Sequence, residues 1–179
     1  MRKQVLTIAM MAVALLVASC GNKSGNNASG ADSTQVAPKN EAKASEVKTT
    51  YEKKLFSVGA PEGWETMPND DPESTDIMLL KGGIENVMKD AFVIAEVRPT
   101  EGETLESGMK EAEEDGKAKV LDDVTAGGFT YKHLYLEEGE MPGHILVAQQ
   151  GDQFITFTIG KADVDDPDVQ AILQSFKLK

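Results

Sequence analysis

Hydrophobic and polar residues alternate in short runs beyond residue 50, and this pattern predicts β-strands. Phe129–Leu136 is the clearest run, because aromatic residues and a histidine occupy every second position. A period of two places such residues on one face of a strand. Glycine or proline follows several similar runs. We expect seven strands, at Lys54–Val58, Ile77–Lys81, Ala91–Val97, Val120–Val124, Phe129–Leu136, His144–Gln150 and Gln153–Ile159.

Two other segments have a helical period. Thr104–Lys117 places apolar residues at i, i+4 and i+7 on a charged background, and Pro167–Phe176 places them at i, i+3, i+4 and i+7. Asp165 or Asp166 is expected to cap the second helix, with Pro167 in its first turn. Hairpin-connected strands without regular strand–helix alternation predict an α+β fold. We expect a mainly antiparallel sheet of about seven strands flanked by two helices.

The N-terminus has a different pattern. Arg2 and Lys3 precede Val5–Ala18, an apolar run of 14 residues broken only by Thr7. A helix of that length spans about 21 Å, which is shorter than the roughly 30 Å hydrocarbon core of a bilayer. The segment is therefore interpreted as the hydrophobic region of a signal peptide rather than a permanent membrane span.

The residues that follow this run, Val17-Ala18-Ser19-Cys20-Gly21, resemble the lipobox of bacterial lipoproteins. The resemblance implies cleavage between Ser19 and Cys20 and attachment of diacylglycerol to the Cys20 sulfur. It also implies a fatty acid such as palmitate on the freed amine. More than one acyl chain gives a stable membrane anchor. Gly21 stands where an aspartate would retain the lipoprotein in the inner membrane, so the periplasmic face of the outer membrane is expected.

Residues 21–50 are rich in glycine, asparagine, serine, alanine and lysine. Such a segment lacks the apolar surface to offset the entropy of ordering, and it predicts a flexible tether. The expected organisation is a signal peptide at residues 1–19, the lipidated Cys20 and tether at residues 20–50, and one globular domain at residues 51–179.

Charge and cysteine content exclude several classes of function. The 30 acidic residues outnumber the 18 basic ones, and residues 51–179 alone contain 27 acidic and 12 basic residues. Nucleic-acid binding depends on lysine and arginine neutralising phosphates, so we expect no nucleic-acid partner. The single cysteine cannot form an internal disulfide or a cysteine-rich metal site.

Two motifs of the domain are similar to those of PsbP-like and DcrB-like domains. Phe56-Ser57-Val58 followed by Pro61-Glu62-Gly63-Trp64 is similar to their opening, and Ile172-Leu173-Gln174-Ser175-Phe176-Lys177-Leu178 resembles their last helix. The resemblance spans residues 54–178 and implies a central antiparallel sheet flanked by helices. It implies no common activity, since a fold does not define a function.

His133 and His144 are the only histidines and lie on neighbouring predicted strands. Pairing of these strands around Glu137–Gly143 could bring both imidazoles near Glu138 or Glu140, which together form a zinc-type ligand set. The sequence contains no ligand motif such as H-E-x-x-H. The preferred interpretation is therefore two surface or rim histidines, with no metal or cofactor.

Two acidic segments are open to a second interpretation. Asp163, Asp165 and Asp166 have the density of oxygen ligands that calcium prefers, but the segment lacks the glycine and distal glutamate of an EF-hand loop. Capping of the last helix, with acids at the positive end of its dipole, is preferred. Asp70–Glu73 is expected to be an exposed, solvated loop.

No enzyme motif is recognisable: the sequence lacks G-x-S-x-G, a P-loop and G-x-G-x-x-G. We therefore expect a lipid-anchored, non-enzymatic accessory or binding module that engages another envelope protein. The alternative is a protein that binds divalent cations or a small ligand through the acidic loops or the His133/His144 pair. A hydrolase remains a third class, since catalytic groups assemble in space rather than in sequence.

Overall fold

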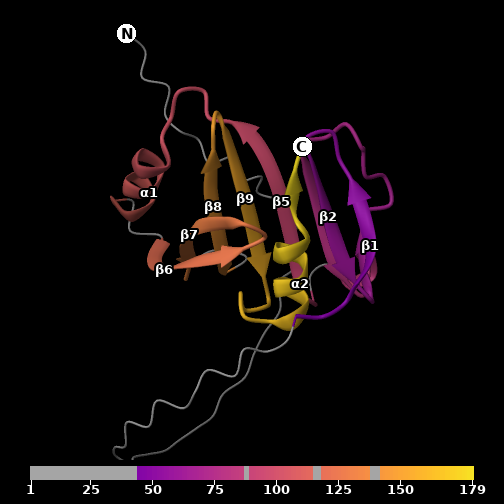
Figure 1. The fold of residues 1–179 in the computed structure, drawn as a ribbon. Helices are drawn as coiled ribbons and strands as arrows, with labels where there is room; N and C mark the ends of the chain where they lie inside the picture. The colour runs from indigo at the N-terminus through magenta and orange to yellow at the C-terminus, as the bar shows by residue number, and fades with distance from the viewer. Residues whose placement is uncertain (1–43, 87–88, 115–117, 138–141) are drawn as a thin grey trace, which may run out of the picture. The chain divides into compact units, whose positions relative to one another are not determined.

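The fold is described by a computed structural model for residues 44–86, 89–114, 118–137 and 142–179. The predicted signal peptide, Ser19, Cys20, and the tether up to residue 43 lie outside the described residues, as do Glu138 and Glu140. Within the described part, strands and helices form an α+β fold in which every strand pair is antiparallel (Figure 1). The predicted fold class is confirmed.

The larger sheet has seven strands, all in antiparallel pairs. Its order across the sheet is β3 (Trp64–Thr66), β4 (Asp76–Lys81), β5 (Phe92–Pro99), β9 (Gln153–Gly160), β8 (Gly143–Gln150), β7 (Phe129–Leu136) and β6 (Ala118–Ala126). A smaller sheet pairs β1 (Val47–Glu52) and β10 (Lys177–Leu178) with the two edges of β2 (Phe56–Pro61). Helix α1 (Leu105–Glu114) contacts β6 and β8, and a 3-10 turn, η1 (Ile84–Asn86), follows β4.

Several sequence predictions need correction. The predicted strand Lys54–Val58 corresponds to β2, which begins at Phe56. β2 pairs with β1 in the smaller sheet and is therefore not part of the large one. β1, β3 and β10 were not predicted, since they are short or polar and are defined by backbone pairing to a neighbour. β1 also begins at Val47, so the folded part starts before the predicted end of the tether at residue 50.

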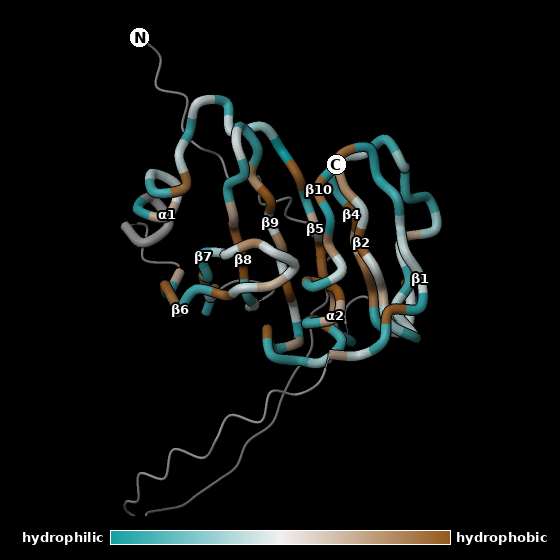
Figure 2. The backbone as a smooth tube through the Cα atoms, viewed as in Figure 1, coloured by the Kyte–Doolittle hydropathy of each residue, from teal (hydrophilic) through white to brown (hydrophobic). Residues whose placement is uncertain are grey.

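One core lies between the large sheet and a layer made by α2 (Pro167–Ser175) and β2. Phe56 stacks on Phe176 with ring centroids 5.3 Å apart, and Phe157 meets Phe176 edge-on at 5.3 Å. Figure 2 shows hydrophobic residues gathered along β2, β4, β5 and β9, the strands that supply most of this core. Burial of these side chains is the main stabilising force for the fold.

The start of α2 agrees with its predicted cap. The Asp166 carboxylate accepts hydrogen bonds from the backbone N–H groups of Asp168 (2.8 Å) and Val169 (3.4 Å), and Pro167 opens the helix. The cap therefore satisfies two of the N–H groups that a helix leaves unpaired at its start. No helix in the described part of the chain is long and apolar enough to cross a membrane.

Candidate functional site

The structure brings the two histidines into direct contact. β7 and β8 pair so that Tyr135 lies opposite His144 and His133 lies opposite Leu146. His133 and His144 are therefore diagonal neighbours on one face of the sheet. The Nε2 atom of His133 lies 2.8 Å from the Nδ1 atom of His144, which is a hydrogen bond between the rings.

His133 is only 5% exposed, and its surroundings favour the neutral ring. Burial lowers the pKa of His133, and the positive charge that His144 can take lowers it further. A hydrogen bond with the Asp122 backbone opposes this shift, as do the charges of Asp163 and Asp165. The net direction is a lowered pKa, so His133 stays neutral at pH values where an ordinary histidine begins to take up a proton.

Asp122, whose backbone opposes the lowering of the His133 pKa, lies on the neighbouring strand β6. In the neutral pair, one of the two facing nitrogens, His133 Nε2 or His144 Nδ1, carries the proton and the other accepts the hydrogen bond. A break in the β6 register between Leu121 and Val124 includes Asp122, which is where the strand departs from regular pairing.

His144 is part of a surface pocket of about 470 Å³. The residues that line it come from the ends of β7 and β8 and from the start of the β9–α2 loop: Tyr135, Pro142, Gly143, His144, Lys161, Ala162 and Asp163. The Tyr135 and His144 rings lie 4.9 Å apart between centroids. The lining of the pocket therefore combines two neighbouring aromatic rings with charged side chains.

The acidic candidates are not gathered into a metal site. Asp166 caps α2, and Asp163 both lines the pocket and accepts a hydrogen bond from the Asp165 backbone N–H at 3.2 Å. Among the described residues, no group of three or more His, Cys, Asp or Glu side chains is placed to hold a metal ion. The histidine pair therefore has no third ligand in this part of the chain.

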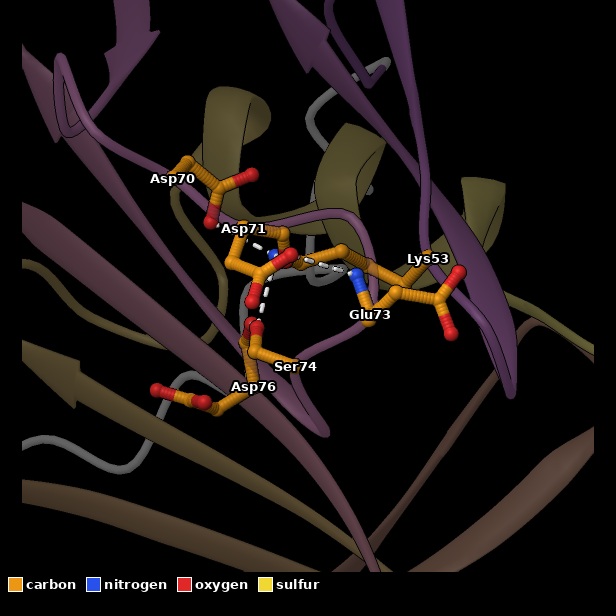
Figure 3. Close-up of polar contacts among 6 residues, drawn as sticks. All are labelled: Lys53, Asp70, Asp71, Glu73, Ser74 and Asp76. Atoms are coloured by element: carbon orange, nitrogen blue, oxygen red, sulfur yellow. Dashed lines mark hydrogen bonds and ion pairs between the residues drawn. The ribbon is translucent and has the colours of Figure 1, made fainter.

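A buried lysine that the sequence analysis missed organises the loop at Asp70–Ser74. The Lys53 side chain has no exposed surface, and its Nζ donates to Asp70 Oδ1 (2.6 Å), the Asp71 carbonyl (2.5 Å) and Ser74 Oγ (2.8 Å). Figure 3 shows the Lys53 side chain extending in among these three residues. Asp71 and Glu73 are exposed as predicted, whereas Asp70 is turned inward as the partner of Lys53.

Asp168, the first acidic residue inside α2, joins three distant segments. Its carboxylate accepts hydrogen bonds from Ser45 Oγ (2.6 Å), Trp64 Nε1 (3.1 Å) and Lys81 Nζ (2.8 Å). Burial raises the pKa of Asp168, but the three hydrogen bonds outweigh it and hold that pKa below its ordinary value. The hydrogen bond from the Trp64 indole N–H to Asp168 therefore joins β3 to the first turn of α2.

Comparison with known proteins gives a distant likeness in fold. No protein family model and no curated protein matches the chain. Among solved structures, the chain is similar to cyanobacterial PsbP (CyanoP) from Synechocystis sp. PCC 6803, with 14% identity, a TM-score of 0.45, and coverage of 73% of this chain and 92% of that one. A crystal structure from Bacteroides thetaiotaomicron VPI-5482 has 10% identity and a TM-score of 0.45 over 70% of this chain. The chain spans 45% of the length of that protein. At this distance neither likeness bears on function.

Proposed function

We propose that this protein is a lipid-anchored module of the bacterial envelope that acts without catalysis, as an accessory or binding partner of another envelope protein. The observation that carries the proposal is Val17-Ala18-Ser19-Cys20-Gly21 at the end of a charged-then-apolar N-terminal segment. Small residues before a cysteine at this point are what lipidation of the Cys20 thiol requires. A doubly or triply acylated terminus holds a protein stably at a membrane surface.

The segment between Cys20 and the domain supports the proposal. Ser45 is joined to the start of α2, because its backbone N–H donates to the Pro167 carbonyl at 2.9 Å and its hydroxyl donates to Asp168. The polar segment before Ser45 would then be the whole tether. A flexible chain of some 25 residues has a root-mean-square reach of about 25–30 Å. That reach lets the domain meet a partner above the lipid headgroups.

The proposal is tested by cross-linking in the cell, with the full-length protein and its Cys20→Ser variant expressed at equal levels. The expected result is one stoichiometric envelope protein that cross-links to the wild type and is lost or strongly reduced in the variant. Cross-linking of the wild type to no envelope protein would overturn the accessory role.

A second candidate function is the binding of a small ligand or a divalent cation at the His133/His144 pair. The pocket that His144 lines favours this candidate, since its volume of about 470 Å³ lies in the range of small-molecule sites. A ligand that binds the folded state raises the melting temperature. Thermal unfolding of the full-length protein with millimolar zinc, manganese or calcium tests the cation version, and an unchanged melting temperature with all three removes it.

A further inference from the structure

The two rings of the histidine pair differ in their freedom to move. His133 is 5% exposed and lies on β7, between β6 and β8 in the large sheet. His144 is half-buried and lines the surface pocket of about 470 Å³. The pairing of β8 with β9 holds the His144 backbone opposite Ile159, so a movement of its ring is a rotation of the side chain. The pocket gives that rotation room, whereas the close-packed surroundings of His133 do not.

The hydrogen bond between the rings depends on how many protons the pair holds. The neutral pair places one proton between His133 Nε2 and His144 Nδ1, and either nitrogen can be the donor. With one added proton, one ring is charged and donates, while the other ring still turns a lone pair towards it. With two added protons, both facing nitrogens carry a hydrogen and neither can accept. The 2.8 Å contact is then lost, whichever tautomer the neutral pair holds.

Groups on several neighbouring segments act on the proton of His133. Asp163 and Asp165, in the β9–α2 loop, and the Asp122 backbone on β6 favour the charged ring, whereas burial and a positive charge on His144 oppose it. The residues directly opposite His133 on β6 and β8 are leucines, which carry no charge. Burial is the largest effect, so the pKa of His133 is lowered. The second proton therefore enters the pair only in solutions more acidic than a free histidine requires.

The pocket includes a group that suits a charged His144 ring. The Asp163 carboxylate lines it, and Oδ1 of that carboxylate accepts a hydrogen bond from the Asp165 backbone N–H at 3.2 Å. A carboxylate accepts more than one hydrogen bond, so Asp163 can also receive an N–H of the imidazolium. Lys161 lines the pocket as well, and its positive charge directs a charged ring to the Asp163 side.

We propose that the histidine pair is an acid-sensitive switch: when both rings are charged, His144 turns out of its hydrogen bond with His133 and into the pocket, towards Asp163. His133 keeps its buried position. The contact of His144 with the Tyr135 ring, 4.9 Å between centroids, changes with the rotation. The surface around the pocket therefore differs between neutral and acidic conditions. The switch is independent of the lipid anchor, of the protein partner and of any ligand.

NMR of the full-length protein in detergent micelles, with labelled histidine rings, tests the proposal as the pH is lowered from about 7.5, where a histidine is ordinarily neutral. We expect two protonation steps that both rings report, as coupled groups do. The nuclear Overhauser effect between the two rings should persist through the first step and disappear in the second. The backbone amides of β5 and β9 should be unchanged at that pH, because the movement is confined to one side chain.

Variants test the two ends of the movement separately. His144→Gln keeps a side chain that can hydrogen-bond to His133 but takes up no proton, so we expect one protonation step and no acid-dependent change at Tyr135. Asp163→Asn removes a charge that favours the proton on His133 and alters neither ring, so the second step should move to lower pH. Asp152→Asn, at an exposed hairpin position, is the matched control and should leave both steps unchanged.

Three results would overturn the proposal. If the Overhauser effect between the rings survives the second step, the hydrogen bond does not depend on the proton count. If it disappears together with the signals of folded β5 and β9, the change is acid unfolding of the domain rather than a switch. If Asp163→Asn moves the second step no more than Asp152→Asn does, Asp163 does not receive the charged ring.

Discussion

The Nζ of Lys53 lies 2.6 Å from Oδ1 of Asp70, and the lysine side chain has no exposed surface. The next residue, Lys54, has a side chain that is 63% exposed and comes within only 3.7 Å of Glu73. Two adjacent lysines therefore have opposite roles: one fixes a loop from inside the protein, and the other lies in solvent.

The first prediction uses this adjacent pair. Lys53→Met removes the charge and leaves Asp70, the Asp71 carbonyl and Ser74 without their common donor. Loss of one partner of a buried ion pair costs about 3 kcal/mol or more. Lys54→Met should change the free energy of unfolding by less than about 0.5 kcal/mol, as exposed pairs do. Urea unfolding of both variants measures the difference in their free energies of unfolding. Equal values would show that Lys53 does not stabilise the loop at Asp70–Ser74.

The second prediction concerns Asp168. Asp168→Asn replaces one acceptor oxygen by an NH₂ group, so the carboxylate can no longer serve Ser45, Trp64 and Lys81 together. We expect a loss of about 2 kcal/mol, the range for hydrogen bonds to a charged group. Asp152→Asn, at an exposed hairpin position, is the matched control and should be nearly neutral.

The same residue predicts a pH dependence with a definite sign. Because the folded-state pKa of Asp168 lies below its ordinary value, its contribution is fully present above the unfolded pKa of about 3.9. The contribution is lost as the pH falls through the folded pKa. Urea unfolding from pH 5 downwards should therefore show a smaller loss for Asp168→Asn than for the wild type. Parallel curves for the two proteins would contradict this.

A third prediction concerns the proton of His133. The lowered pKa means that the unfolded state takes up a proton first, so stability falls as the pH drops below about 6.5 towards the folded pKa. Long-range ¹H–¹⁵N NMR at pH values just below 6.5 should show a neutral His133 ring. A charged His133 ring at these pH values would contradict the burial of His133 against His144.

Periodicity predicts the parts of the fold that bury apolar side chains. Both helices follow from this periodicity. α1 (Leu105–Glu114) lies inside the predicted range Thr104–Lys117, and residues 115–117 of that range lie outside the described part of the chain. Strands such as β5 and β9 have a buried face that leaves an apolar signal. β1 leaves none, because most of its side chains are exposed and its backbone bonds to β2 define it.

The sequence also predicts only part of the candidate site. His133 and His144 lie on consecutive predicted strands, so the sequence indicates that they could approach each other if the strands pair, but the preferred interpretation of two surface or rim histidines is wrong for the buried His133. The register that decides their 2.8 Å contact, and the Lys161 and Asp163 side of the pocket, depend on tertiary structure. Lys53 gave no signal at all, since nothing in the sequence separates it from Lys54.

The fourth prediction tests how the β6–β7 turn packs on α2. Gly127 and Gly128 both have positive φ, +60° and +87°, as a two-residue hairpin turn requires. A Cβ at Gly127 would lie 2.6 Å from the Leu173 carbonyl oxygen, whereas one at Gly128 meets nothing within 4 Å. Both alanine variants share a backbone strain of about 1 kcal/mol.

Gly127→Ala should therefore be the less stable of the two by roughly 1–3 kcal/mol, the cost of forced overpacking. Chemical unfolding of the two variants under identical conditions checks the order. Gly128→Ala being equally or more destabilising would mean that the turn does not contact α2 as described.

The central claim, an envelope module held by a lipid at Cys20, is tested most directly by metabolic labelling with an alkyne fatty acid and mass spectrometry of the protein from cell membranes. We predict a mature chain that begins at Cys20 and carries diacylglycerol on its sulfur, with labelling abolished in Cys20→Ser. A wild-type protein that retains residues 1–19, or that begins at Cys20 without a lipid, would contradict the account.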